Sequence, residues 1–180
     1  ATYNLNDSNY KVVKGEFTVN VKRIVTTISV NDLSGLTYKA NTTYTITATA
    51  TNAGEAKPVI TVNGSETYSI GNAGTYNVVV SVEESAHYTA ATLEYEIVIA
   101  KANPTTDFTK VNTAVWNTKL SAITLPTGYA WVNPDTVLST VGNGQTFAAT
   151  FTPSDTANYN TITSSFTVNV EKATATITAN

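Results

Sequence analysis

The chain has 180 residues, of which 42% are hydrophobic and only 13% are charged, and its formal net charge is −3. This weakly acidic balance, without runs of like charge, excludes an electrostatic footprint for nucleic acid or for an anionic membrane, and apolar stretches no longer than a strand exclude membrane insertion as a helix. The absence of cysteine excludes disulfides, thiolate metal sites and cysteine nucleophiles.

Apolar and polar residues alternate with period two along most of the chain, which predicts β-strands and no helices. Asn63–Gly64 predicts a tight type I′ hairpin, because both residues tolerate positive φ, and Pro126, Gly128 and Pro134 predict loops or edge strands. In chain order, we predict strands over 43–51, 59–63, 67–70, 76–82, 89–100, 115–119, 131–132, 137–138, 146–152 and 160–171. Short antiparallel strands of this kind bury their apolar faces best in a two-sheet sandwich.

Three blocks of the sequence share one spacing, in which a tyrosine is followed seven residues later by a second aromatic residue and then by a basic residue. The blocks are 10–23, 88–101 and 159–172. The strand at 76–80 also aligns without a gap with 147–151. We therefore predict tandem immunoglobulin-like antiparallel β-sandwich repeats: the tail of a preceding repeat at 1–23, whole repeats at 24–101 and 102–172, and the start of a further repeat or a linker at 173–180.

The pattern acid-x-Ala-x-Tyr precedes the last strand of both whole repeats and predicts a tyrosine corner, in which the ring is buried and its hydroxyl bonds to backbone upstream. The acid would accept backbone N–H groups in the turn. Calcium binding at a repeat junction is an alternative for these acids, and we expect no other cofactor. The predicted corner residues are Tyr10, Tyr88, Tyr159, Glu84 and Asp155.

The run from Leu120 to Trp131, followed by Asn133-Pro-Asp135 and by 146–160, resembles the immunoglobulin-like repeats, related to the MBG type, of large Firmicutes cell-surface proteins. The resemblance covers 102–172 well and 24–101 mainly in its last two strands. It implies a structural spacer on the outside of a bacterial cell, in an adhesin, an S-layer-associated protein or a glycan-degrading enzyme, with neighbouring repeats as partners. It implies no catalytic residues.

We predict that the chain is not an enzyme. The lone His87 lies where two other blocks have asparagine, and no paired carboxylate site or phosphate-binding loop is present. Two other functions stay open. Tyr129, Trp131 and Trp116 could stack on a glycan, or contact a host surface protein, unless they fill the core instead. Unpaired strands within 1–23 could assemble a surface lattice or fibre.

Overall fold

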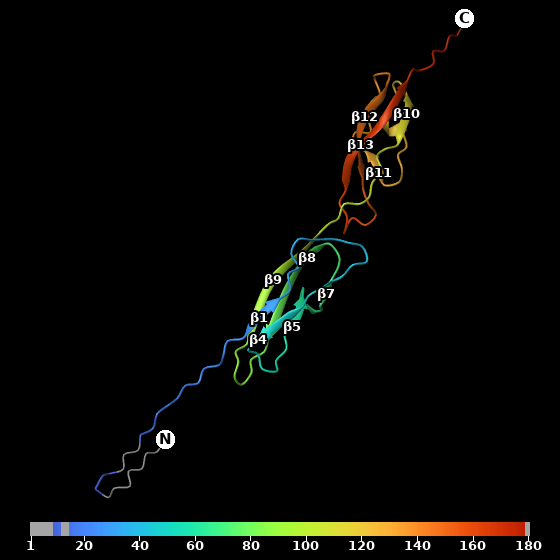
Figure 1. Ribbon diagram of the computed structural model, residues 1–180. Helices are drawn as coiled ribbons and strands as arrows, with labels where there is room; N and C mark the ends of the chain where they lie inside the picture. The colour runs from blue at the N-terminus through green and yellow to red at the C-terminus, as the bar shows by residue number, and fades with distance from the viewer. Residues whose placement is uncertain (1–8, 12–14, 179–180) are drawn as a thin grey trace.

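The computed structural model describes residues 9–11 and 15–178, and in these ranges the chain is all-β apart from a single 3-10 turn, η1 at Leu120–Ala122. No helix in the described residues has the length and apolar character needed to cross a membrane. Figure 1 shows two β lobes that follow each other end to end. We call 24–101 the N-terminal lobe and 102–172 the C-terminal lobe.

The N-terminal lobe contains nine strands, and its largest sheet has the order β2-β9-β8-β5-β6. The shorter pairs β1-β4 and β3-β7 are antiparallel and complete the lobe. The strands are β1 Thr27–Val30, β2 Leu36–Thr37, β3 Tyr44–Thr45, β4 Ala48–Thr51, β5 Val59–Val62, β6 Ser65–Glu66, β7 Ser69–Ile70, β8 Gly74–Val82 and β9 Ala91–Ala100. A core formed by residues such as Ile46, Val80 and Ile97 fills the interior.

The hairpin predicted at Asn63–Gly64 is confirmed, with φ values of 49° and 80° and Val62 paired with Ser65. Of the strand predicted at 67–70, only 69–70 forms, as β7. β6 precedes the predicted bounds and completes the hairpin, whereas β7 pairs with β3 in a different sheet. Local alternation cannot distinguish these partners, because the same pattern fits either sheet.

The C-terminal lobe contains one four-stranded sheet of order β10-β13-β12-β11. Its strands are β10 Val111–Val115, β11 Tyr129–Trp131, β12 Gly142–Phe151 and β13 Ile162–Glu171. Hydrogen bonds of 2.9 Å from Leu120 N–H to Thr136 and from Leu138 N–H to Thr118 join two further segments. These segments contribute Leu120 and Leu138 to a second, separate core around Phe166.

The strand predicted at 115–119 is wrong, because β10 ends where that segment was expected to begin. Asn117 has a φ of 67° and turns the chain out of the sheet. The all-antiparallel expectation also needs correction. β2 runs parallel to β9, and β10 runs parallel to β13, at one edge of each large sheet.

The two lobes repeat the same register at this parallel edge. However, the ungapped alignment predicted between 76–80 in β8 and 147–151 in β12 is wrong. Tyr95 pairs with Val78 and Phe166 pairs with Phe147, so β8 and β12 correspond with an offset of 69 residues, against 71 for β9 and β13. The loop before the last strand absorbs the two residues. A shift of two keeps every side chain on its original face, which is why the sequence pattern does not reveal it.

Residues 15–23 form no strand, and the side chains of Phe17, Val19 and Val21 are exposed. The remainder of the segment predicted to be the tail of an earlier repeat lies largely outside the described residues.

Candidate functional site: the junction between the lobes

The segment Asp155–Tyr159, just before β13, forms a tight turn at the end of the C-terminal lobe. The Asp155 carboxylate accepts hydrogen bonds from the backbone N–H of Asn158 at 3.2 Å and from its side-chain amide at 2.9 Å. The Tyr159 N–H donates to the Asp155 carbonyl at 3.1 Å. The acid therefore accepts a backbone N–H as the sequence predicts, and it also fixes the orientation of the Asn158 amide. We call 154–160 the corner segment.

The corner segment contacts the N-terminal lobe through two adjacent side chains. The Asn158 side-chain oxygen accepts a hydrogen bond of 2.8 Å from the backbone N–H of Ala73, and Asn158 is only 8% exposed. The Tyr159 ring packs edge-on against the Tyr38 ring, with centroids 5.2 Å apart and an interplanar angle of 84°. Edge-to-face aromatic pairs contribute about 0.5–1.5 kcal/mol beyond their buried area. These contacts join the lobes over and above the covalent connection.

The connecting peptide is itself held against the corner segment. The Lys101 ammonium donates to the Thr156 carbonyl at 2.6 Å, and the Ala102 N–H donates to the Asn158 carbonyl at 2.9 Å. The Ala102 carbonyl accepts from the Asn160 N–H at 2.8 Å, so Ala102 and Tyr159 form a parallel bridge. Because β9 ends at Ala100, no free linker separates the two lobes.

Burial of Tyr38, followed by the nearby Tyr159 hydroxyl and Asp155 carboxylate, raises the pKa of its phenol above the ordinary value. Both neighbours belong to the other lobe. A negative charge on Tyr38 would be poorly solvated and repelled there, so the junction favours the neutral phenol.

The N-terminal end of the N-terminal lobe repeats this pattern. The Ile24 N–H donates to the His87 carbonyl at 2.9 Å, and the Thr89 N–H donates to the Ile24 carbonyl at 3.0 Å. Arg23 donates to the Ser85 carbonyl at 3.1 Å, as Lys101 does to Thr156. In both lobes, therefore, the turn before the last strand is hydrogen-bonded to the segment of chain that enters the lobe.

The predicted corner acid Glu84 forms an ion pair with Arg23 at 3.2 Å. Both side chains are about half exposed, at 54% and 46% respectively, so the pair contributes little to stability. The His87 side chain is exposed. Among the described residues, no group of three or more potential acid or histidine ligands is placed to hold a metal ion.

The corner tyrosines differ from the predicted arrangement. Tyr88 and Tyr159 are only half buried, and within the described ranges neither hydroxyl bonds to backbone upstream. The Tyr159 ring faces the preceding lobe, and Tyr88 lies against Gly54, where an added Cβ would be 3.4 Å from its ring. Tyr10 is 66% exposed. In the C-terminal lobe the corner is held by backbone hydrogen bonds and by Asp155, which leaves the Tyr159 ring free to contact a neighbour.

The three aromatic candidates for glycan stacking do not share a surface. Trp131 is 8% exposed and donates its indole N–H to the Ile123 carbonyl at 3.0 Å. Tyr129 accepts from the Asp107 N–H and packs edge-on against Phe166 in the core. Trp116 instead lies at the far end of the lobe, 45% exposed, with its indole N–H bonded to Ser139. The core interpretation therefore fits Trp131 and Tyr129, but not Trp116.

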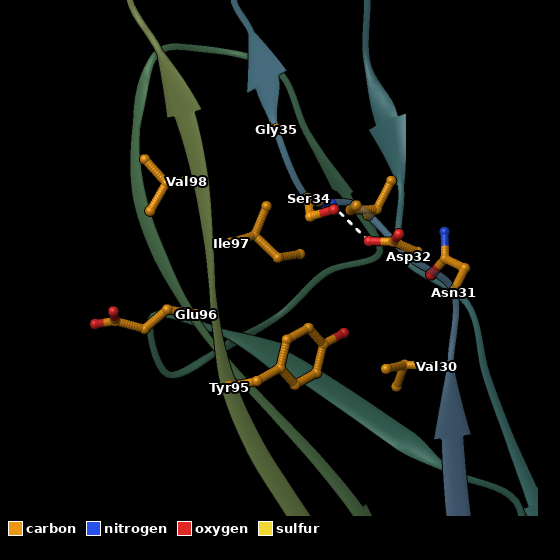
Figure 2. Close-up of a pocket in the computed structure, with 10 residues that line it drawn as sticks. Val30, Asn31, Asp32, Ser34, Gly35, Tyr95, Glu96, Ile97 and Val98 are labelled. Atoms are coloured by element: carbon orange, nitrogen blue, oxygen red, sulfur yellow. Dashed lines mark hydrogen bonds between the residues drawn. The ribbon is translucent and has the colours of Figure 1, made fainter.

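A cavity of about 430 Å³ lies where the chain crosses from β1 to β2, beside β9. Figure 2 shows the Tyr95 side chain reaching from β9 toward this crossing segment, while Glu96 points away from it. Asp32 accepts a hydrogen bond from the Ser34 N–H at 2.9 Å, and its bonds with Ser34 lower the pKa of the Asp32 carboxyl. The one inward carboxylate is thus occupied by its own turn.

The Tyr95 hydroxyl is buried without a hydrogen-bond partner, and burial raises the pKa of its phenol. Asp32, which lines the same cavity, is bonded to Ser34.

Tyr38, Ala73 and Asn158 were not predicted from the sequence as junction residues. The only available signal was the pair Asn-Tyr, which appears at 9–10 and again at 158–159. No family model matches the chain, and neither a curated protein nor a solved structure matches it.

Proposed function

We propose that the chain is a structural spacer of a secreted bacterial cell-surface protein, in which immunoglobulin-like sandwiches repeat end to end. The observation that carries this proposal is the junction. Asn158 and Tyr159 of one lobe contact Ala73 and Tyr38 of the other, without a free linker between them. A stalk needs such junctions, because a flexible linker would let a distal domain fold back.

The immunoglobulin-like assignment draws on the strand order. β1 pairs with β4 in one sheet, and the chain then crosses so that β2 lies parallel to β9 in the other. The first part of the chain therefore contributes β1 to one sheet and β2 to the other, which resembles immunoglobulin-like sandwiches. The C-terminal lobe has the corresponding parallel pair β10-β13, which supports the repeat.

Placement outside the cell, in an adhesin or an S-layer-associated protein, draws on the resemblance of 102–172 to Firmicutes surface repeats. A surface rich in threonine, serine and asparagine, without cysteine, suits that setting. The exposed His87 and the single inward carboxylate of Asp32 give no support for a catalytic role. The proposed partners are other repeats of the same protein.

Small-angle X-ray scattering of the chain tests the proposal. A compact 180-residue protein would have a radius of gyration of about 16 Å. β9 and β13 each have 10 residues, so each lobe is about 33 Å long. Two such lobes in line give a radius of gyration above about 20 Å and a two-peaked distance distribution. A value near that of the compact protein would refute the stalk.

Tyr38→Ala tests whether the observed contact keeps the lobes in line. We expect broader interlobe distances in that variant. Tyr68 is exposed and its hydroxyl bonds to Glu66 of its own lobe, so Tyr68→Ala should leave these distances unchanged. Equal distributions for the two variants would show that Tyr38 does not stiffen the chain.

A further inference from the structure

The C-terminal end of the C-terminal lobe has the same construction as the end of the N-terminal lobe that receives the corner segment. Tyr38 follows β2 and donates its N–H to the Ala100 carbonyl at 2.8 Å, and Trp116 follows β10 and donates its N–H to the Glu171 carbonyl at 2.8 Å. Trp116 therefore occupies the position that Tyr38 occupies in the other lobe.

The turns beside these two aromatic residues also correspond. Ala73 precedes Gly74, which pairs with β9, and Val141 precedes Gly142, which pairs with β13. The turns are also held alike, since the Tyr76 hydroxyl donates to the Asn72 carbonyl and the Gln145 amide donates to the Thr140 carbonyl, both at 2.8 Å. The Val141 N–H therefore corresponds in position to the Ala73 N–H, which donates to the Asn158 side chain.

The chain leaves both lobes with the same dipeptide, Lys101–Ala102 in one and Lys172–Ala173 in the other. Lys101 and Ala102 hold the corner segment through the Thr156 and Asn158 carbonyls. Lys172 and Ala173 follow β13 directly and carry the same two donors, a lysine ammonium and an alanine N–H.

The two ends differ in what covers them. Tyr38 and Ala73 are half buried beneath the corner segment, whereas Trp116 is 45% exposed and Val141 is 43% exposed. An open hollow of about 410 Å³ lies here, lined by Trp116, Val141 and 172–175. Among the described residues, no group accepts a hydrogen bond from the Val141 N–H.

We infer that Trp116, Val141 and Lys172 form a docking face for the corner segment of a further repeat joined in series through Lys172–Ala173. The tyrosine of that segment packs edge-on against Trp116, and its asparagine accepts the Val141 N–H. The occupant is thus defined by its chemistry, as a turn of the form acid-x-Ala-Asn-Tyr. This inference deepens the proposed spacer function and rests on it, because it names the partner of the exposed end of the C-terminal lobe.

The test extends the chain after Lys172 with a second copy of residues 102–180, so that Lys172 precedes an alanine as Lys101 does. The indole N–H resonance of Trp116 is observed by NMR and assigned with Trp116→Phe. We expect this resonance to shift on extension while that of Trp131 in the same lobe stays in place. Tyr159→Ala in the appended copy should return it to its position in the chain of 180 residues.

Trypsin cleavage after Lys172 provides a second readout that does not depend on the appended tyrosine. We expect extension to slow this cleavage at least tenfold, to the rate found at Lys101, and Trp116→Ala to restore most of the original rate. Val132→Ala is the matched control, since Val132 is 46% exposed and lies away from the docking face.

The outcomes separate the two proposals. Rapid cleavage at Lys172 with an unshifted Trp116 resonance, while Lys101 stays protected, overturns the docking face and leaves the spacer standing. Rapid cleavage at Lys101 in the chain without the extension overturns the spacer itself. A Trp116 resonance that moves on addition of an oligosaccharide, but not on extension, would reassign this face to glycan binding and overturn the inference.

Discussion

Replacing Asn158 with alanine should destabilise the C-terminal lobe and loosen its contact with the N-terminal lobe. The substitution removes one hydrogen bond to the Ala73 N–H and one to the Asp155 carboxylate. A neutral hydrogen bond contributes about 0.5–1.5 kcal/mol and one to a charged group about 1.5–3 kcal/mol. Because Asp155 is half exposed, the lower ends apply, and we expect a total loss of about 2 kcal/mol.

Tryptophan fluorescence during urea denaturation measures this loss selectively, because both tryptophans of the chain, Trp116 and Trp131, lie in the C-terminal lobe. Unfolding slopes near 1 kcal/mol per molar urea are usual for domains of this size, so the midpoint should fall by about 2 M. Asn133→Ala is the matched control, since Asn133 is exposed in the same lobe and its side chain forms no hydrogen bond within the described residues.

Amide hydrogen exchange at Ala73 isolates the bond that crosses between the lobes. We expect the Ala73 N–H to exchange at least tenfold faster in Asn158→Ala, whereas amides in the middle of β8 keep their protection. A midpoint within about 0.3 M of the Asn133→Ala control, together with unchanged exchange at Ala73, would refute the assignment of Asn158 as the residue that connects the lobes.

Because the pKa of Tyr38 is raised, chiefly by burial and then by the neighbouring tyrosine and acid of the other lobe, the junction is intact below about pH 10 and weakens as pH rises through the shifted value. Scattering between pH 9 and pH 12 should show this change, and Tyr38→Phe should reduce it. Gly128→Ala places a Cβ 2.8 Å from the half-buried Phe151 ring at a φ of 87°, whereas Gly144→Ala, at a φ of 75°, meets nothing within 4 Å. We expect losses of about 3 kcal/mol and about 1 kcal/mol respectively, measured by the same fluorescence assay, and equal losses would contradict the clash. Tyr95→Phe removes a buried hydroxyl without a partner and should stabilise the N-terminal lobe by about 1 kcal/mol; hydrogen exchange of β9 amides checks this, and slower exchange is the expected result.

The two lobes correspond closely at the position of Tyr95. Phe166 occupies in the C-terminal lobe the position that Tyr95 occupies in the N-terminal lobe. Phe166 pairs with β12 at the point of the register where Tyr95 pairs with β8. Phe166 is fully buried and carries no polar atom, so that lobe avoids the unsatisfied hydroxyl.

The sequence by itself determined the features that depend on neighbouring residues. Period-two alternation predicted long strands such as β8 and β13, and Asn63–Gly64 predicted the hairpin, because strand pleating and turn geometry are local properties. The shared spacing around Tyr88 and Tyr159 predicted that the two halves would end alike, and both corners do pair with the incoming chain.

Only the tertiary structure decided which aromatic residues face the core and which face a neighbour. Trp131 and Trp116 lie in similar sequence surroundings, but one fills the core and the other remains half exposed at the end of the lobe. Tyr159 contacts Tyr38, a residue far away in the chain. The burial of a side chain at the end of a strand depends on what packs against that end, and segments distant in the sequence supply it.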